Sequence, residues 1–263
     1  MKIFIGPAGI GKGAAGLQAI KAAGLNAAEV EFTYSIYMNA KTAAEIGNFA
    51  KKLGINLSIH APYWINLNSA EKKKVEQSKQ RILKCCEIGH YLGASPIVFH
   101  PGFYGSMDMN ETYKTIKNAI QGMQKVIKQR KWRVSLAPET TGKINVFGDL
   151  HEIGMLVKET GCSFCVDFAH LKARSIGRMN YEDILNKLNY NFKKEMLSNV
   201  HAHFSGVEWT SKGEKRHIIT SENEIKLLAD AIKKQQGIKS ITIINESPNP
   251  LGDSIKMKDV FEK

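Results

Sequence analysis

The stretch Ile97-Val98-Phe99-His100 shows the pattern that decides the fold, a short apolar and β-prone run that ends in an imidazole. Similar runs end in an acidic or imidazole side chain at five other places: His60, Glu139, Asp167, His203 and Glu246. Imidazole nitrogen and carboxylate oxygen are ligands for divalent cations. A parallel barrel brings the carboxyl end of every strand to one face. The pattern therefore predicts a barrel with a metal site at the C-terminal face of its strands.

Strand-like and helical segments alternate from one end of the sequence to the other. The predicted strands are 2–6, 28–32, 56–60, 95–100, 133–138, 162–167, 198–203 and 240–246. The predicted helices are 14–23, 40–53, 70–92, 110–131, 150–159, 181–197 and 222–236. This alternation favours a parallel sheet, and 263 residues lie close to the roughly 250 that are typical of a (β/α)8 barrel. Because no segment resembles a linker, we expect one α/β domain, a single (β/α)8 TIM barrel over residues 1–263.

The composition is that of a globular protein with an excess of positive charge. There are 37 Lys and Arg residues against 25 Asp and Glu residues, which gives a formal net charge of +12. Such an excess indicates a polyanionic partner, and a lysine-rich solvated surface is the alternative. The sequence has no apolar run long enough to span a membrane, and it opens as a strand that enters a glycine turn at Gly6 rather than as a signal peptide. We expect an intracellular, cytoplasmic protein.

Two local motifs suggest other chemistry, but each has a simpler interpretation. Residues 6–13 match G-x-x-x-x-G-K, the phosphate-binding P-loop pattern, until Gly13 replaces the hydroxyl residue that binds magnesium. A glycine-rich turn between a strand and a helix explains them better. Cys162 and Cys165 form a C-x-x-C within an apolar run, with no second such pair. Because free cysteine is among the most buried residue types, a buried strand is expected there.

The candidate ligands are more informative together than singly. Several carboxylates and imidazoles around one barrel mouth are costly to bury unless cations neutralise them. Asp167 and His170 are three residues apart at a strand end, so they can face neighbouring metal ions, and His217 is expected just beyond another strand. His201 and His203 share one face of a strand because side chains alternate with period two. We expect only His203 to reach the metal, with His201 either one layer below or in contact with a ligand rather than with the metal.

Nearly the whole chain resembles the endonuclease IV family of apurinic/apyrimidinic endonucleases, which belongs to the xylose isomerase-like barrels. The resemblance is carried by seven motifs: Ile59-His60-Ala61-Pro62, Val98-Phe99-His100-Pro101-Gly102, Pro138-Glu139-Thr140, Asp167-Phe168-Ala169-His170, His203-Phe204-Ser205, Lys215-Arg216-His217 and Asn245-Glu246-Ser247-Pro248. It implies a zinc-dependent phosphodiesterase of base excision DNA repair. Such an enzyme would act as a monomer on double-stranded DNA and hydrolyse the phosphodiester 5′ to abasic sites.

The resemblance also implies a centre with three zinc ions and a role for each ligand. The implied sets are His60, His100 and Glu139 at the first ion, Glu139, Asp167, His203 and Glu246 at the second, and His170 with His217 at the third. Glu139 would bridge the first two ions. Glu246 would orient the attacking water and accept its proton, which makes these two glutamates the predicted catalytic residues.

One departure from the family concerns the third ion. The family places an aspartate two residues before the histidine, where this chain has Lys215, with Glu214 beside it. A charged lysine cannot ligate zinc. The third ion is then weak or absent, or Glu214 substitutes through a shifted backbone, or Lys215 supplies positive charge near the leaving group. We therefore expect two tightly bound zinc ions.

A second departure concerns DNA binding. The family's second loop carries an arginine that wedges into the base stack, and Tyr37 stands at that position here. Tyr63 and Trp64 follow His60 where the family has its aromatic and apolar wedge. Aromatic side chains can stack on bases and partly replace the missing one. Tyr37, Tyr63 and Trp64 are the predicted DNA-binding residues.

Two other functions fit parts of the pattern. One is a sugar or sugar-phosphate isomerase or epimerase of the xylose isomerase-like group, which would share the metal-binding mouth and use a carboxylate as a proton shuttle. The fold alone does not separate it from the endonuclease, because one fold can carry several functions. A barrel that binds DNA without cleaving it would also tolerate Lys215. The positive charge, the aromatic pair and the number of ligands favour the endonuclease.

Overall fold

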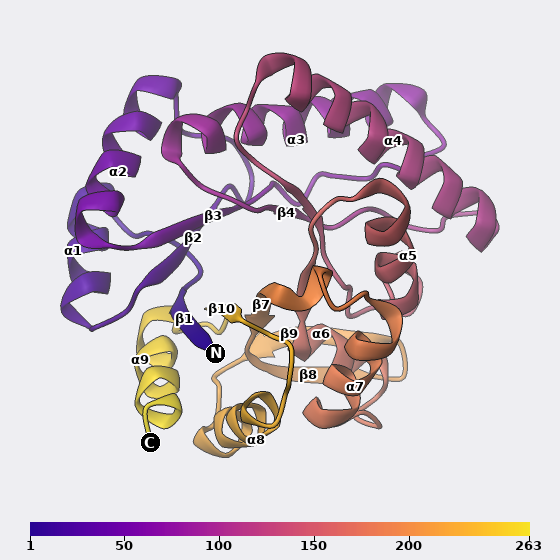
Figure 1. Ribbon diagram of the computed structural model, residues 1–263. Coiled ribbons are helices and arrows are strands. Elements are labelled where there is room, and N and C mark those ends of the chain that lie inside the picture. Colours follow the sequence, from indigo (N-terminus) through magenta and orange to yellow (C-terminus); the bar gives the residue numbers. More distant parts are fainter.

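The computed structural model describes residues 1–263 and shows a closed parallel barrel with helices around it (Figure 1). The barrel strands are β1 (Lys2–Pro7), β2 (Ala27–Glu31), β3 (Asn56–His60), β4 (Ile97–Phe99), β5 (Leu136–Pro138), β6 (Cys165–Asp167), β7 (Asn199–Phe204) and β10 (Ser240–Asn245). They pair in parallel in the orders β1-β10-β7-β6 and β2-β3-β4-β5. Parallel bridges between Ala8 and Glu29 and between Glu139 and Cys165 join the two halves. The predicted α/β TIM barrel is confirmed.

Nine α-helices surround the strands (Figure 1). They are α1 (Gly13–Ala22), α2 (Ala40–Leu53), α3 (Lys72–Leu92), α4 (Met109–Arg130), α5 (Leu150–Thr160), α6 (Phe168–Arg174), α7 (Tyr181–Asn191), α8 (Glu222–Lys233) and α9 (Pro250–Phe261). Side-chain caps define several of their first turns. The Asp149 side chain accepts from the Glu152 backbone N–H in a capping box at α5, which satisfies donors that the helix itself leaves free. None of the helices has the length and apolar character that crossing a bilayer requires.

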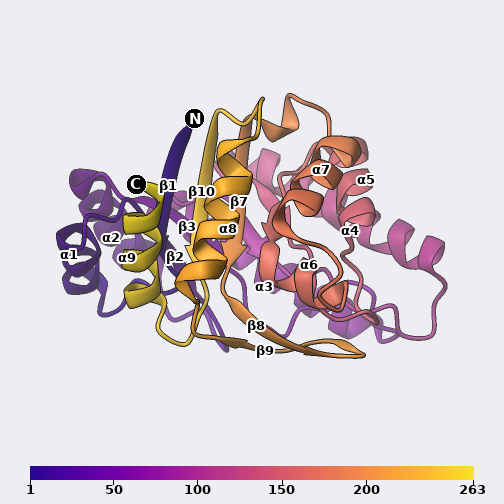
Figure 2. The same cartoon turned by 90° about the horizontal axis from the view of Figure 1, so that it is seen from below.

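The structure adds elements that the sequence pattern did not predict. Two antiparallel strands, β8 (Gly206–Thr210) and β9 (Gly213–Ile218), form a hairpin after β7. Figure 2 shows this hairpin across the end of the barrel opposite the N-terminus. His217, which was expected just beyond a strand, lies within β9. Helices α6 and α9 were also missed, and α7 ends at Asn191 rather than at residue 197. The hairpin strands are polar and partly exposed, so no apolar alternation reveals them.

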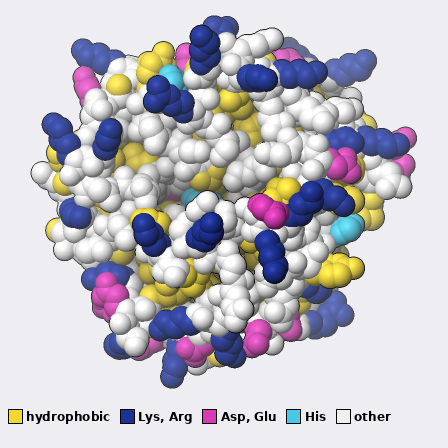
Figure 3. Space-filling model, in the orientation of Figure 1, with side chains coloured by type: hydrophobic (Ala, Val, Ile, Leu, Met, Phe, Trp, Pro, Cys, Tyr) yellow, Lys and Arg dark blue, Asp and Glu magenta, His cyan; other side chains and the backbone are white.

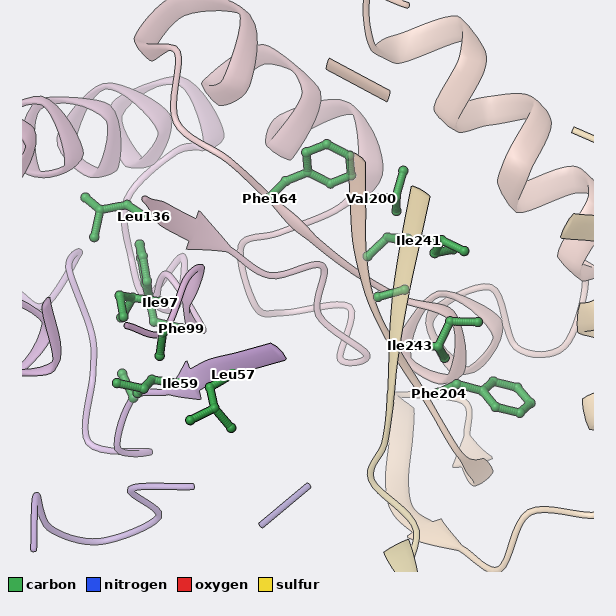
Figure 4. Close-up of a cluster of buried hydrophobic side chains, with 14 of the residues drawn as sticks. Leu57, Ile59, Ile97, Phe99, Leu136, Phe164, Val200, Phe204, Ile241 and Ile243 are labelled. Atoms are coloured by element: carbon green, nitrogen blue, oxygen red, sulfur yellow. The ribbon is translucent and has the colours of Figure 1, made fainter. Parts of the chain in front are cut away.

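The main core lies between the barrel strands and the helices. Alternate strand residues such as Leu57 and Ile59 of β3 belong to this core (Figure 4), whereas Ser58 and His60 do not. Val98, Ala137 and Cys165 form a separate small apolar cluster. Since side chains alternate along a strand, one face of the strands packs on the helices. The other face fills the barrel with small and polar groups.

Both motifs with alternative interpretations have structural roles. The turn between β1 and α1 uses Gly9, Gly11 and Gly13 at φ angles of 89°, 61° and 55°, a region that favours glycine. The predicted glycine-rich turn is confirmed. Cys162 and Cys165 are both buried and free, but Cys162 precedes β6 rather than lying in it.

Candidate metal centre

Glu139 stands at the middle of the candidate site, in the first position after β5. It is fully buried. Its Oε2 lies 3.1 Å from His60 Nε2 and 2.9 Å from His100 Nε2. Its Oε1 lies 3.2 Å from His170 Nδ1 and 3.2 Å from His203 Nδ1. Oε2 thus faces His60 and His100 while Oε1 faces His203, so Glu139 belongs to two groups of potential ligands and is placed to bridge two cations.

A second group of potential ligands shares Glu139. One ligand atom from each of Glu139, Asp167, His203 and Glu246 lies within 4.8 Å of the others. His203 Nδ1 is 3.3 Å from Glu246 Oε1. Asp167 Oδ2 is buried and has no hydrogen-bond partner. Three carboxylates and one imidazole converge here. This second group is therefore the most acidic of the three groups of predicted ligands.

The third group contains His170 and His217, as predicted, together with Asp167. The Nε2 atoms of the two histidines are 3.3 Å apart. Glu214 lies beside both, with Oε2 3.4 Å from His170 Nε2 and Oε1 3.8 Å from His217 Nε2. Lys215 points elsewhere: its Nζ is 3.2 Å from Glu208 Oε2 on β8, and its side chain is more than half exposed. Glu214 thus lies where a ligand is needed in place of the aspartate that the endonuclease IV family has at the third ion.

A β-bulge explains why Glu214 rather than Lys215 faces the histidines. Glu208 pairs with Arg216 and Trp209 pairs with Glu214, so Lys215 is the extra residue in β9. A bulge shifts the alternation of side chains by one. Without it, Lys215 and His217 would share a face. The shift brings Glu214 and His217 toward the same imidazole.

Close backbone packing holds the bulge over the barrel. Glu214 N–H donates to Gly142 O at 3.0 Å, in the loop after β5. A Cβ on Gly142 would lie 2.6 Å from Glu214 Cβ, and a Cβ on Gly213 would lie 2.2 Å from Gly142 O. Both positions therefore require glycine. The Arg174 guanidinium donates to the carbonyls of Val146 and Lys143 and so fixes this loop.

The electrostatics of the cluster follow from burial and mutual pairing. Burial alone would raise the pKa of Glu139, but the imidazoles of His100 and His203 hold it well below its usual range. Burial would lower the pKa of His60, but its hydrogen bond to Glu139 raises that pKa to about 10. Burial raises the pKa of Glu246 to about 7. Nearby carboxylates likewise raise the pKa of His170 and His203, so these three histidines favour the protonated form beside the carboxylates.

The donor set fits divalent cations. Zinc is bound by imidazole nitrogen and carboxylate oxygen, usually with four ligands. The four ligand atoms of the second group meet that number, and the third group reaches it when Glu214 joins Asp167, His170 and His217. The first group supplies three ligands and leaves a position open. All eight predicted metal-ligand residues lie in these three groups.

The predicted DNA-binding aromatics lie at different distances from the site. Tyr63 lines a cavity of about 640 Å³ above the cluster, and its ring centroid is 6.3 Å from that of His60. Trp64 and Tyr37 are 63% and 62% exposed and do not line this cavity. Tyr37 packs edge-on against Phe32. The structure thus brings only Tyr63 to the cavity itself.

Several residues of the site were missed in the sequence. Glu31, Phe103 and Lys143 line the same cavity, and Glu29 lies buried below it. The signal for the glutamates was present, because Glu29 and Glu31 alternate within the otherwise apolar strand β2. An acidic side chain inside a buried strand requires a partner or a function. Phe103 and Lys143 lie on loops, where no periodicity identifies them.

Fold and site together define a parallel α/β barrel with a histidine and carboxylate centre at the carboxyl end of its strands. The sequence matches the xylose isomerase-like TIM barrel family over residues 17–260. The chain belongs to that family. Expectation and structure agree on this point.

The relatives include proteins with and without a described activity. An uncharacterized protein of Methanocaldococcus jannaschii, MJ0133, is 35% identical over 244 residues, which cover 91% of this chain and 88% of the relative. A probable endonuclease 4 of Mycoplasma genitalium is 26% identical over 203 residues, 73% of this chain and 67% of the relative. The resemblance to endonuclease IV that the motifs indicated is therefore confirmed, but at low sequence identity.

Solved structures share the fold at still lower identity. Endonuclease IV from Thermus thermophilus superposes with a TM-score of 0.71 at 19% identity. The match covers 99% of this chain and 97% of the Thermus chain. D-psicose 3-epimerase, solved in the presence of D-fructose, gives a TM-score of 0.67 at 15% identity, with 100% and 96% covered. These likenesses establish the barrel and leave the reaction to the site.

Proposed function

We propose that this protein is a zinc-dependent DNA repair endonuclease that hydrolyses the phosphodiester 5′ to abasic sites. The observation that carries the proposal is the linked set of three ligand groups, joined through Glu139 and Asp167. One isolated cation would not need this many ligands. Three neighbouring cations suit phosphoryl transfer, because charge develops on both the attacking and the leaving oxygen.

The residues would share the work as follows. His60, His100 and Glu139 would hold one cation, and Asp167, His203 and Glu246 would hold a second one with Glu139 shared between them. When bound, the cations acidify water and neutralise charge on the phosphate. Glu246 lines the cavity, so its carboxylate is placed to orient the attacking water and to accept a proton.

Glu214 completes the third ligand group in this proposal. The sequence had left open whether the third ion is weak or absent, whether Glu214 substitutes for the missing aspartate, or whether Lys215 supplies charge near the leaving group. The distance from Glu214 to His170 and the outward direction of Lys215 both support Glu214. We therefore replace the expectation of two tight zinc ions with a proposal of three.

DNA would approach across the open mouth, with Tyr63 at the cavity and Trp64 and Tyr37 on the surrounding surface. Lys and Arg side chains are spread widely over the face of the molecule that Figure 3 shows. The net charge of +12 therefore supports general attraction to DNA, while recognition of the lesion depends on the mouth.

The decisive experiment compares cleavage of a duplex with one abasic site and cleavage of its intact control, with and without zinc. We expect incision 5′ to the lesion only, abolished by a chelator and restored by zinc. A zinc-loaded protein that leaves the abasic duplex intact would overturn the proposal.

One observation favours a second candidate, a sugar epimerase. Glu246 lines a cavity of about 640 Å³, which lies within the range of small-molecule pockets, and Glu139 belongs to the same ligand group beneath it. Two such carboxylates could exchange a proton on either side of a sugar carbon. Interconversion of D-fructose and D-psicose by the same zinc-loaded preparation, without DNA incision, would establish this alternative.

A further inference from the structure

A buried glutamate that contacts two histidines lies beneath the proposed metal centre, inside the barrel. Glu29 of β2 is fully buried, and its Oε2 is 3.0 Å from His201 Nε2. Its Oε1 is 2.9 Å from His203 Nε2. One carboxylate thus contacts both histidines of β7, and His203 is the one that belongs to the metal centre.

The ring of His203 has a definite direction. Its Nδ1 faces the centre, 3.2 Å from Glu139 and 3.3 Å from Glu246. Its Nε2 faces away, toward Glu29. A neutral imidazole that offers a lone pair at Nδ1 must carry its proton at Nε2. The second nitrogen therefore needs an acceptor if His203 is to be a ligand.

Glu29 is the available acceptor. Neither His203 Nε2 nor Glu29 Oε1 has another hydrogen-bond partner, and their contact is close but off-line for a hydrogen bond. His201 anchors the other carboxylate oxygen, and the pairing of β2 with β3 fixes the backbone of Glu29.

We propose that Glu29, anchored by His201, is a positioning residue that orients His203 and selects the tautomer that binds metal through Nδ1. Ligating histidines commonly donate their other ring N–H to a carboxylate, which fixes the ring and strengthens the ligand. This inference rests on the proposed metal centre and adds a residue pair that would support it from below.

The test measures zinc affinity directly, with zinc alone competing against a chromophoric chelator, in the full-length protein and its variants. Glu29→Gln keeps the size of the side chain but removes its charge. We expect this variant to lower the affinity for the zinc ion at His203 by about 10- to 100-fold, the usual effect of losing such a partner. Glu152→Gln, which removes another buried carboxylate, should leave that affinity unchanged.

A second readout separates orientation from general stability. Nitrogen-15 NMR of histidine in the zinc-loaded protein should show His203 protonated at Nε2, and Glu29→Gln should alter that signal. Equal zinc affinity and an unchanged tautomer in Glu29→Gln would overturn the inference. Zinc binding that His203→Ala leaves intact would instead overturn the metal centre.

His201→Asn keeps the proposal testable if Glu29→Gln does not fold. This variant removes the anchor of Glu29 and leaves the contact to His203 in place. We expect weaker zinc binding, by less than in Glu29→Gln. Affinity equal to that of the unmodified protein would count against a positioning role.

Discussion

At the scale of single residues, the centre depends on Glu139, because each of its oxygens faces a different pair of imidazoles. A neutral amide keeps this shape but cannot hold two cations together. We expect Glu139→Gln to abolish cleavage of an abasic duplex and to keep DNA affinity, since phosphate attraction comes from basic side chains elsewhere. Turnover and DNA binding would be measured on one preparation. Near-native turnover under limiting zinc would refute the bridging role.

Tyr63 is the aromatic residue that the cavity selects. Its side chain lines the space above His60, where the abasic nucleotide of the proposed substrate would lie. We expect Tyr63→Ala to weaken binding of an abasic duplex by about 1–3 kcal/mol, the range for one stacking aromatic, with less effect on intact DNA. Tyr190, which is 89% exposed on α7 and does not line the cavity, provides the control. Equal losses for both duplexes would assign Tyr63 to general contact.

At the scale of elements, the β8–β9 hairpin places the third ligand group. Its bulge turns Glu214 toward His170 and turns Lys215 away. We expect Glu214→Gln to release about one zinc ion per chain, since zinc usually seeks four ligands. The neighbouring Lys215→Ala should leave the metal content unchanged. Metal analysis after dialysis would decide, and loss of an ion only in Lys215→Ala would reverse the assignment.

At the scale of the whole molecule, the buried cluster links stability to pH. The pKa of His60 is raised to about 10 from a usual 6.5 by its bond to Glu139, against the effect of burial. Its contribution to folding is therefore fully present below pH 6.5 and is lost as the pH rises through 10. The raised pKa of Glu246, about 7 against a usual 4.5, acts in the same direction.

We therefore expect the thermal unfolding midpoint of the metal-free protein to decrease as the pH rises from 6.5 to 10. Zinc should remove this fall, because metal ions replace the protons on the imidazoles and bind more tightly as the pH rises. Thermal unfolding with chelator and with zinc, over the same buffers, measures both. A metal-free midpoint that rises over this range would contradict the pairing of His60 with Glu139.

The barrel and most of the candidate centre could be predicted from the order of the amino acids alone. Apolar runs that end in His or an acid are local features, and a parallel barrel necessarily collects the ends of its strands on one face. His60, His100, Glu139, Asp167 and Glu246 could therefore be placed together in advance.

Only the tertiary structure decided the rest, because it depends on contacts between distant elements. The bulge that exchanges Glu214 for Lys215 arises where β9 meets the loop at Gly142, and no local pattern encodes that packing. The contact of Glu29 with His203 joins strands 174 positions apart in the sequence (203 less 29). Strand periodicity gives the face on which a side chain lies, but the closure of the barrel determines what it meets there.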